Sequence, residues 1–298
     1  MKNLFYLLLA ISFFSCGRSE KPVTQNKEQG KDTVSKTVAN TKQVQNLPDT
    51  NVKIYGYFVG EFKAVKYDET KDITFTNKIT ISLDSIRGEN FFGHSVVAGN
   101  NRPFKGTYQS SGKNIIVEAA EPGDDKYDGK FSFTVYPESQ SVKGKWNAYK
   151  SNVYVTEREY ELKKREFTYN PDLKLPEDVS WTSLYEQNPT LAELKSEKGE
   201  FLTNDVLKVN ASKKLLNKSE IENMHKGDLE IIRNSIYARH GYSFKNRKIR
   251  YIFDNNVDWY MPVSTDVTKE LTEIEIKNID LLKRYEQHAE KYYDTFGR

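Results

Sequence analysis

The first half of the chain alternates apolar and polar residues with a period of two between Ile54 and Phe167. Successive side chains of a β-strand point to opposite faces, so this alternation predicts half-buried strands. The clearest apolar positions are Ile79, Ile81 and Leu83, then Phe131, Phe133 and Val135, and then Val142, Gly144, Trp146 and Ala148. Each set predicts one strand face that is buried in a core.

Turn-forming residues separate these runs, as at Arg87–Asn90, Gly99–Asn101 and Ser110–Gly112. Short strands at roughly ten-residue spacing are typical of antiparallel meanders that close into a barrel or a sandwich. We therefore expect an all-β antiparallel domain over residues 50–168, with about eight strands in a lipocalin-like architecture. The pattern leaves open whether side chains fill the interior or leave room for one small ligand.

The second half changes to helical periodicity, and residues 217–298 predict a mainly α-helical domain. Ser219 with Glu222, and Thr272 with Glu275, have the spacing of capping boxes. A longer helix is expected from about Asp228 to Gly241, because glycine commonly follows a helix end. The last helix has an apolar stripe at Ile274, Leu281, Leu282 and Tyr285. Residues 169–216 are interpreted as a connector that packs on one domain.

The N-terminus has the organisation of a secretory signal. Lys2 precedes an apolar run from Leu4 to Phe14, which is too short to span a bilayer as a helix. The run leads to Cys16, and this ending resembles a bacterial lipobox, whose Cys is diacylated and becomes the mature N-terminus. Residues 1–16 are therefore expected to be a lipoprotein signal peptide. An ordinary signal peptide is the alternative, because Phe13 and Phe14 depart from stricter lipoboxes.

Acyl chains on Cys16 would anchor the protein stably to a membrane, because two chains suffice where one is marginal. Gly17 is not an acidic retention residue. By resemblance to lipoprotein sorting in Gram-negative bacteria, this implies the outer membrane. Residues 17–49 are polar and predict a disordered tether between the lipid and the first domain.

Charge and composition argue against several classes of partner and site. The net charge of +3 over 298 residues gives no field that would attract nucleic acid. Cys16 is the only Cys, so neither a disulfide nor a thiol-ligated metal is expected in the folded domains. The segment Glu121–Gly129 resembles a calcium loop only in part, since Lys126 and Val135 stand at ligand positions, and it is interpreted as an acidic turn. No metal or cofactor is expected.

The pentapeptide Tyr237-Ala238-Arg239-His240-Gly241 is the most specific motif in the chain. The segments that accompany it are Asp228 to Asn234, Asp258 to Tyr260 and Thr272 to Glu275. In this order they resemble the YARHG family, over a region from about Asn217 to Glu286. The resemblance implies a small domain of an exported bacterial protein. It implies no particular reaction, because the family has no settled biochemical activity.

Two interpretations of the motif stay open. His240 falls near the same line as the apolar residues of the preceding helix, so it is expected to point inward. In the structural interpretation, His240 bonds to loop backbone and Arg239 is clamped on a carboxylate such as Asp258 or Glu275. In the chemical interpretation, His240 is a general base and Arg239 binds an anionic substrate. The sequence singles out no nucleophile for the second interpretation.

A basic cluster directly follows the motif and consists of Lys245, Arg247, Lys248 and Arg250. A solvated loop is the simplest interpretation. In an envelope protein the alternative is an anion site for peptidoglycan carboxylates or lipid phosphates. Trp259 and Tyr260 are candidate aromatic contacts that would stack on apolar or sugar faces.

Together these patterns favour a membrane-anchored envelope lipoprotein that acts as a non-catalytic binding or interaction module for a cell-envelope component. The expected partners are the membrane, through the N-terminal lipid, and peptidoglycan or another envelope component, with no nucleic acid. Two alternatives stay open. One is an envelope hydrolase that uses Arg239 and His240, and the other is a carrier of a small apolar ligand inside the β-domain.

Overall fold

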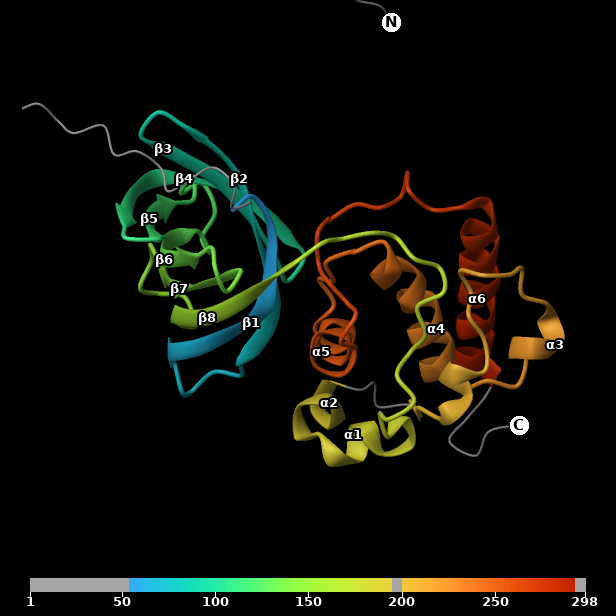
Figure 1. The fold of residues 1–298 in the computed structure, drawn as a ribbon. Helices are drawn as coiled ribbons and strands as arrows, with labels where there is room; N and C mark the ends of the chain where they lie inside the picture. The colour runs from blue at the N-terminus through green and yellow to red at the C-terminus, as the bar shows by residue number, and fades with distance from the viewer. Residues whose placement is uncertain (1–53, 195–199, 293–298) are drawn as a thin grey trace, which may run out of the picture. The chain divides into compact units, whose positions relative to one another are not determined.

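The computed structural model describes residues 54–194 and 200–292. They form a β-barrel and a helical part, which both belong to one compact unit (Figure 1). This two-part architecture confirms the predicted fold class. The predicted signal peptide, Cys16 and the tether lie outside the described residues. Of the helices that are described, none is both long enough and apolar enough to cross a membrane.

The barrel consists of eight antiparallel strands that neighbour one another in sequence order. It closes because β1 pairs with β8 as well as with β2, which confirms a barrel rather than a sandwich. Closure leaves no unpaired edge strand. The strands are β1 (Gly56–Tyr67), β2 (Thr76–Arg87), β3 (Asn90–Val97), β4 (Asn100–Ser111), β5 (Asn114–Ala120), β6 (Gly129–Tyr136), β7 (Ser141–Ala148) and β8 (Val155–Arg165).

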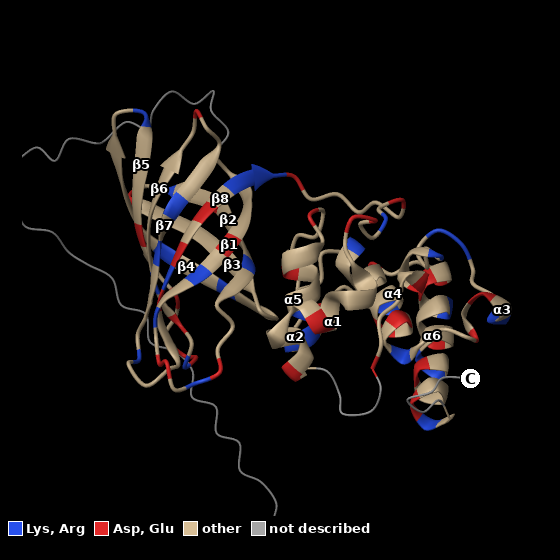
Figure 2. Ribbon diagram, turned by 90° about the horizontal axis from the view of Figure 1, so that it is seen from below, with Lys and Arg blue, Asp and Glu red and all other residues tan. Residues whose placement is uncertain are grey.

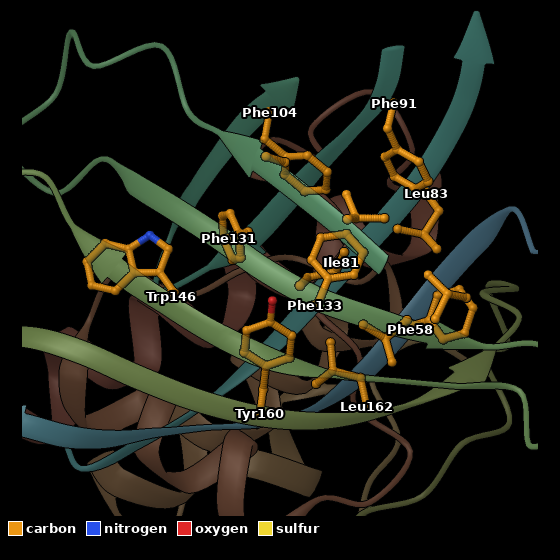
Figure 3. Packing of buried hydrophobic residues seen from close by; sticks show 14 of the residues in the cluster. Phe58, Ile81, Leu83, Phe91, Phe104, Phe131, Phe133, Trp146, Tyr160 and Leu162 are labelled. Atoms are coloured by element: carbon orange, nitrogen blue, oxygen red, sulfur yellow. The ribbon is translucent and has the colours of Figure 1, made fainter. Parts of the chain in front are cut away.

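Apolar side chains fill much of the barrel interior, and Figure 3 shows them pointing toward one another from different strands. The positions predicted to face inward are buried or half-buried. The ring of Phe104 lies 5.3 Å from that of Phe131 and 6.2 Å from that of Phe133, measured between centroids. The rings of Phe91 and Phe133 meet edge-on, with centroids 6.0 Å apart. Such edge and tilted contacts are the favourable arrangements for aromatic pairs.

The helical part is built around one central helix. Its elements are the 3-10 helices η1 (Trp181–Ser183) and η2 (Asn204–Leu207) and the helices α1 (Leu184–Gln187), α2 (Pro189–Leu194), α3 (Lys218–Ile221), α4 (Lys226–Arg239), α5 (Arg247–Asn256) and α6 (Glu273–Tyr292). Leu229, Ile232 and Ile236 of α4 pack in an apolar cluster shared with α6. Ile231 and Ala238 belong to a second cluster, shared with α5 and α1. Helix α4 therefore joins the two clusters.

The first turn of α6 has the predicted capping box. The Glu275 N–H donates to Thr272 Oγ1 at 3.2 Å, and the Thr272 N–H donates to Glu275 Oε2 at 2.9 Å. Leu282 is fully buried as expected, but Ile274 is 39% exposed, so its place in the stripe was wrong. The reason is that this turn directs Glu275 inward instead.

At α3 the predicted capping box was wrong by two residues. The N-cap is Asn217, and its partner is Glu220, whose Oε2 accepts a hydrogen bond from the Asn217 N–H at 2.9 Å. Ser219 donates to Asn217 Oδ1 at 2.6 Å and so supports the cap from inside the helix. Asn caps a helix as well as Ser does, which is why spacing alone selected the wrong pair.

Helix α5 is tied to the wall of the barrel. The Lys78 N–H on β2 donates to Asp254 Oδ2 at 2.8 Å, and Lys78 Nζ donates to the Val257 carbonyl at 3.0 Å. Arg165 of β8 donates to the Asp258 carbonyl at 3.0 Å. These bonds join the two parts of the compact unit.

Candidate functional site

The motif Tyr237–Gly241 ends helix α4. Arg239 is the last residue of the helix and His240 is its cap. Gly241 has a φ of 71°, in the left-handed region that glycine adopts without strain. A Cβ at this position would overlap with Val263 Cγ2, so both the backbone and the available space require glycine. The structure confirms that glycine follows the helix end, since Gly241 comes directly after the cap residue His240.

His240 is buried against the first turn of α6. Its Nε2 lies 2.8 Å from Glu275 Oε2, and its ring stacks on Tyr169 with centroids 4.1 Å apart. Burial opposes ionisation of Glu275, but hydrogen bonds from His240 and the Thr272 N–H outweigh it and hold the pKa of Glu275 at about 2. The His240 side chain is only 3% exposed, so the imidazole is closed to a substrate in solution.

Arg239 is buried on another side of the helix end. Its Nε donates to the Leu173 carbonyl at 2.9 Å, and its Nη1 donates to Ser235 Oγ at 2.8 Å. The guanidinium also lies over the Trp259 ring, 5.8 Å from the centroid. Burial lowers the pKa of Arg239 to about 10. The side chain therefore fastens residues before the helical domain to α4.

The partners of these two side chains are exchanged relative to the structural interpretation of the sequence. His240 contacts the carboxylate of Glu275, whereas Arg239 contacts a carbonyl and hydroxyl groups. Adjacent residues on a helix point about 100° apart, so the two side chains meet different segments. Ser235 Oγ donates to the Ile232 carbonyl at 2.7 Å and is committed to the same network. The motif therefore joins the end of α4 to the first turn of α6 through His240, and to the segment at Leu173 through Arg239.

The basic cluster after the motif is largely engaged inside the protein. Lys248 is 8% exposed and its Nζ donates to Glu230 at 2.5 Å and to Glu200. Burial disfavours its charge, but Glu230 and Glu200 together raise the pKa of Lys248. This lysine is thus a buried ion-pair partner and not a surface cation.

The other three basic residues differ in their surroundings. Arg247 Nη2 donates to Asp72 Oδ1 at 2.7 Å, and Arg250 Nε donates to Asn77 Oδ1 at 3.1 Å. Both arginines therefore contact the barrel. Lys245 is exposed. Figure 2 shows that acidic and basic residues are interspersed over the strands and helices rather than gathered by sign.

The two candidate aromatic contacts belong to the packing of the helical part. Tyr260 is 1% exposed, and its hydroxyl donates to the Tyr242 carbonyl at 2.8 Å. Trp259 is half-buried, and its Nε1 donates to the Lys174 carbonyl at 2.6 Å. The structure does not bring these rings and the basic cluster together on one open surface of the described residues.

A cavity of about 390 Å³ lies at one mouth of the barrel. Its aromatic wall comes from Phe62, Phe131 and Trp146. Inward-facing polar side chains line it as well, namely Asn77, Ser95, Glu121 and Arg158. Arg247 and Arg250 of α5 complete the wall. The volume falls within the range of small-molecule sites, which also combine apolar walls with a few polar groups.

Glu121 is the buried acid of this cavity, with 7% exposure. Its Oε2 accepts hydrogen bonds from the Gly129 N–H at 2.7 Å and from Trp146 Nε1 at 3.1 Å. Ser95 Oγ donates to Oε1 at 3.3 Å. Burial raises the pKa of Glu121 to about 7 despite these bonds. The carboxyl group is therefore fixed in place and changes charge near neutral pH.

Arg158 is the buried cation of the same cavity, with 8% exposure. It donates to the carbonyls of Phe62 at 2.9 Å, Thr74 at 3.0 Å and Phe75 at 3.1 Å. Burial, and to a smaller extent the charge of Arg250, lower the pKa of Arg158 to about 10. These bonds hold the guanidinium across the start of β2.

The acidic turn beside the cavity is organised by an arginine. Asp128 is 1% exposed and accepts hydrogen bonds from Arg102 Nη2 at 2.7 Å and from the Gly123 N–H at 2.8 Å. Arg102 also pairs with Asp124. In the part of the chain that is described, no group of three or more His, Cys, Asp or Glu side chains is placed to hold a metal ion.

Residues 204–287 match the family model described as the YARHG domain. The C-terminal part of the chain is a YARHG domain. No curated protein and no solved structure matches the chain. The YARHG match begins inside the segment that we predicted as a connector. Thr203, just before it, donates to the buried Asp228 from its N–H at 2.7 Å and from its hydroxyl at 2.8 Å, so this segment is bonded to the first turn of helix α4 of the domain.

Apart from Arg247 and Arg250, the cavity residues were missed as site residues by sequence reasoning. Arg158 has the same strand register as the buried residues Tyr160 and Leu162, so a basic residue in an apolar register was the available signal. Glu121 gave no such signal, because it follows the last residue of β5. The YARHG domain contributes Arg247 and Arg250 to the cavity, which connects the named domain to the barrel.

Proposed function

We propose that this protein is a lipid-anchored envelope protein of a Gram-negative bacterium and acts as a non-catalytic binding module. The YARHG domain supports an envelope-associated role. The apolar run that leads to Cys16 supports anchoring through lipid at that residue, in the outer membrane. The burial of His240 and Arg239 argues against a hydrolase built on the motif.

The barrel-mouth cavity is the ligand site that we propose for this module. The observation that carries the proposal is a hollow of about 390 Å³ in a barrel whose remaining interior is packed with side chains. A barrel needs no such hollow for stability, because unfilled space forfeits packing contacts. The YARHG domain would then serve to close and shape the site through α5.

Native mass spectrometry of the mature protein from its own host tests the proposed site. We expect a small molecule of defined mass to remain bound. Ser95→Leu, which places a larger side chain in the cavity, should abolish that mass. Thr134→Leu on the outward face of β6 is the matched control and should retain it. If Ser95→Leu, folded by circular dichroism, keeps the ligand, the cavity is not the site.

Anchoring at Cys16 is tested by fractionation in the native host. The protein should incorporate labelled palmitate and sediment with outer membranes. Cys16→Ser should lose the label and appear in a soluble or secreted fraction. A Cys16→Ser variant that stays in the membrane fraction would show that the N-terminal lipid is not the anchor.

Peptidoglycan is the envelope partner that we propose beyond the membrane. The exposed basic residue beside the motif, Lys245, supports contact with wall carboxylates. Mature protein should sediment with purified sacculi, and Lys245→Glu should sediment less. Absence of sedimentation would remove peptidoglycan from the proposal and leave the cavity ligand unaffected.

A further inference from the structure

Two arginines face the barrel-mouth cavity and donate only to neutral acceptors among the described residues. Arg158 donates to three backbone carbonyls. Arg250 donates to the Asn77 amide oxygen and to two backbone carbonyls. Arg158 is buried and Arg250 is half-buried, and the charge of Arg250 disfavours that of Arg158. A buried cation is costly unless it is paired with an anion.

The other two arginines of the cavity wall are neutralised. Arg102 pairs with Asp128 and Asp124, and Arg247 pairs with Asp72. The remaining acid that attracts Arg250 is Asp254 on the same helix, which accepts a hydrogen bond from the Lys78 N–H. Burial raises the pKa of Asp254 to about 7, so it is a weak counter-ion near neutral pH. The excess positive charge of the cavity therefore resides on Arg158 and Arg250.

Aromatic rings stand beside this charge. The Arg158 guanidinium lies over the Phe62 ring, 5.2 Å from its centroid. Phe62 in turn meets Trp146 edge-on, with centroids 6.0 Å apart. Phe131 adds a third ring to the same cavity. An occupant in contact with these walls would carry a flat apolar body next to its charged group.

We propose that the cavity binds a small organic anion, with Arg158 and Arg250 holding its anionic group and Phe62 and Trp146 covering its apolar body. This ligand class rests on the proposed function, which places the ligand in this cavity. Guanidinium groups suit the purpose because they donate in a fork that matches a carboxylate. Glu121 is held three strands away from β8 around the barrel by its own hydrogen bonds, and so does not compete for the arginines.

A matched pair of probes tests the charge requirement. We would titrate the mature protein with 2-naphthoate and with 2-naphthamide, which share the apolar body and differ in charge, and follow calorimetry and tryptophan fluorescence. We expect 2-naphthoate to bind with a dissociation constant below about 1 mM and at least about tenfold more tightly than the amide. Inorganic phosphate at the same concentration should not displace it, because phosphate lacks the apolar body.

Substitutions then test whether Arg250 holds the anionic group of the probe. Arg250→Gln should weaken 2-naphthoate binding about tenfold or more and leave 2-naphthamide binding unchanged, while Arg250→Lys should retain part of the affinity. Lys143→Gln is the matched control, because Lys143 is an exposed cation on the outward face of β7 and does not line the cavity. It should change the affinity less than about threefold. Thermal unfolding of each variant verifies that it is folded.

The outcomes separate this inference from the proposed function. Equal binding of both probes, or equal losses for both in Arg250→Gln, would overturn the anionic class and leave the cavity as a site for neutral ligands. Displacement by phosphate would show that the arginines hold an inorganic anion instead. Failure of both probes, together with no retained ligand in native mass spectrometry, would overturn the proposed site itself.

Discussion

The hydroxyl of Tyr160 is a polar atom enclosed in the barrel without a hydrogen-bond partner among the described residues. The ring packs against Phe62 and Phe131, and burial raises the pKa of Tyr160 well above its ordinary value. An unsatisfied buried polar group costs roughly 1–3 kcal/mol. We expect Tyr160→Phe to raise the free energy of unfolding by about 1 kcal/mol. Urea denaturation measures the change, and a loss of stability would mean that the hydroxyl has a partner, such as a buried water.

Glu275 is the residue on which the motif's histidine depends. Its folded-state pKa of about 2 lies below the ordinary value of 4.5, so its contribution to stability is present above pH 4.5 and is lost as pH falls toward 2. We expect Glu275→Gln to destabilise the protein by about 2–3 kcal/mol between pH 7 and pH 5, and by progressively less as pH falls below about 4.5. Denaturant midpoints of both proteins between pH 7 and 3 measure this.

The control for that experiment is Glu273→Gln. Glu273 lies in the same first turn of α6 but is exposed. It should change stability little at any of these pH values, because exposed charges contribute little. Equal effects of the two substitutions would show that the His240–Glu275 contact does not stabilise the fold.

A carboxyl group on helix α5, that of Asp254, also makes the stability depend on pH, but in the opposite direction. Burial raises the pKa of Asp254 to about 7 from an ordinary 3.8, so its ionisation is harder in the folded state and stability should fall as pH rises from about 4 to 7. The groups that face this carboxyl are Lys78, Arg250 and Tyr260. Asp254→Asn keeps an oxygen to accept the Lys78 N–H, and we expect it to flatten this pH dependence.

Thermal unfolding of both proteins at pH 5 and pH 8 measures the effect. The wild-type midpoint should drop between the two values more than that of Asp254→Asn does. If the midpoints of both proteins drop equally, the pH dependence belongs to other buried acids. The strongest candidates are Glu121 and Asp228, because burial raises their pKa values to about 7 and about 6.

At the scale of elements, the sequence predicted those features that depend on near neighbours. The barrel followed from period-two alternation, and the end of α4 followed from Gly241, whose φ of 71° is a local requirement. The roles of Arg247 and Arg250 did not follow, because their partners Asp72 and Asn77 are more than a hundred residues away in the chain. The cavity was beyond prediction for the same reason, since it depends on which inward positions meet across the closed barrel.

The barrel and the YARHG domain also approach each other closely at Gly99. Its N–H donates to Ser243 Oγ at 2.9 Å, and its φ is 75°. A Cβ at Gly99 would overlap with Lys245 Cγ and lie 3.1 Å from Lys245 Cα. A side chain there would require Lys245 to move, either within its own segment or by a separation of the two parts. We infer that barrel and YARHG domain unfold together as long as this contact holds.

Gly99→Ala tests this coupling, and Gly112→Ala is its matched control. Gly112 also has a left-handed φ, of 61°, but no atom lies within 4 Å of the position that a Cβ would take there, so alanine adds backbone strain alone. We expect Gly99→Ala to cost about 1–3 kcal/mol more than Gly112→Ala, because of the overlap with Lys245. Calorimetry should show one transition for the wild type and Gly112→Ala, and two for Gly99→Ala. If both variants are equally destabilised and each unfolds in a single transition, the contact at Gly99 does not couple the two parts. The bonds from α5 to β2 would then hold the parts together without it.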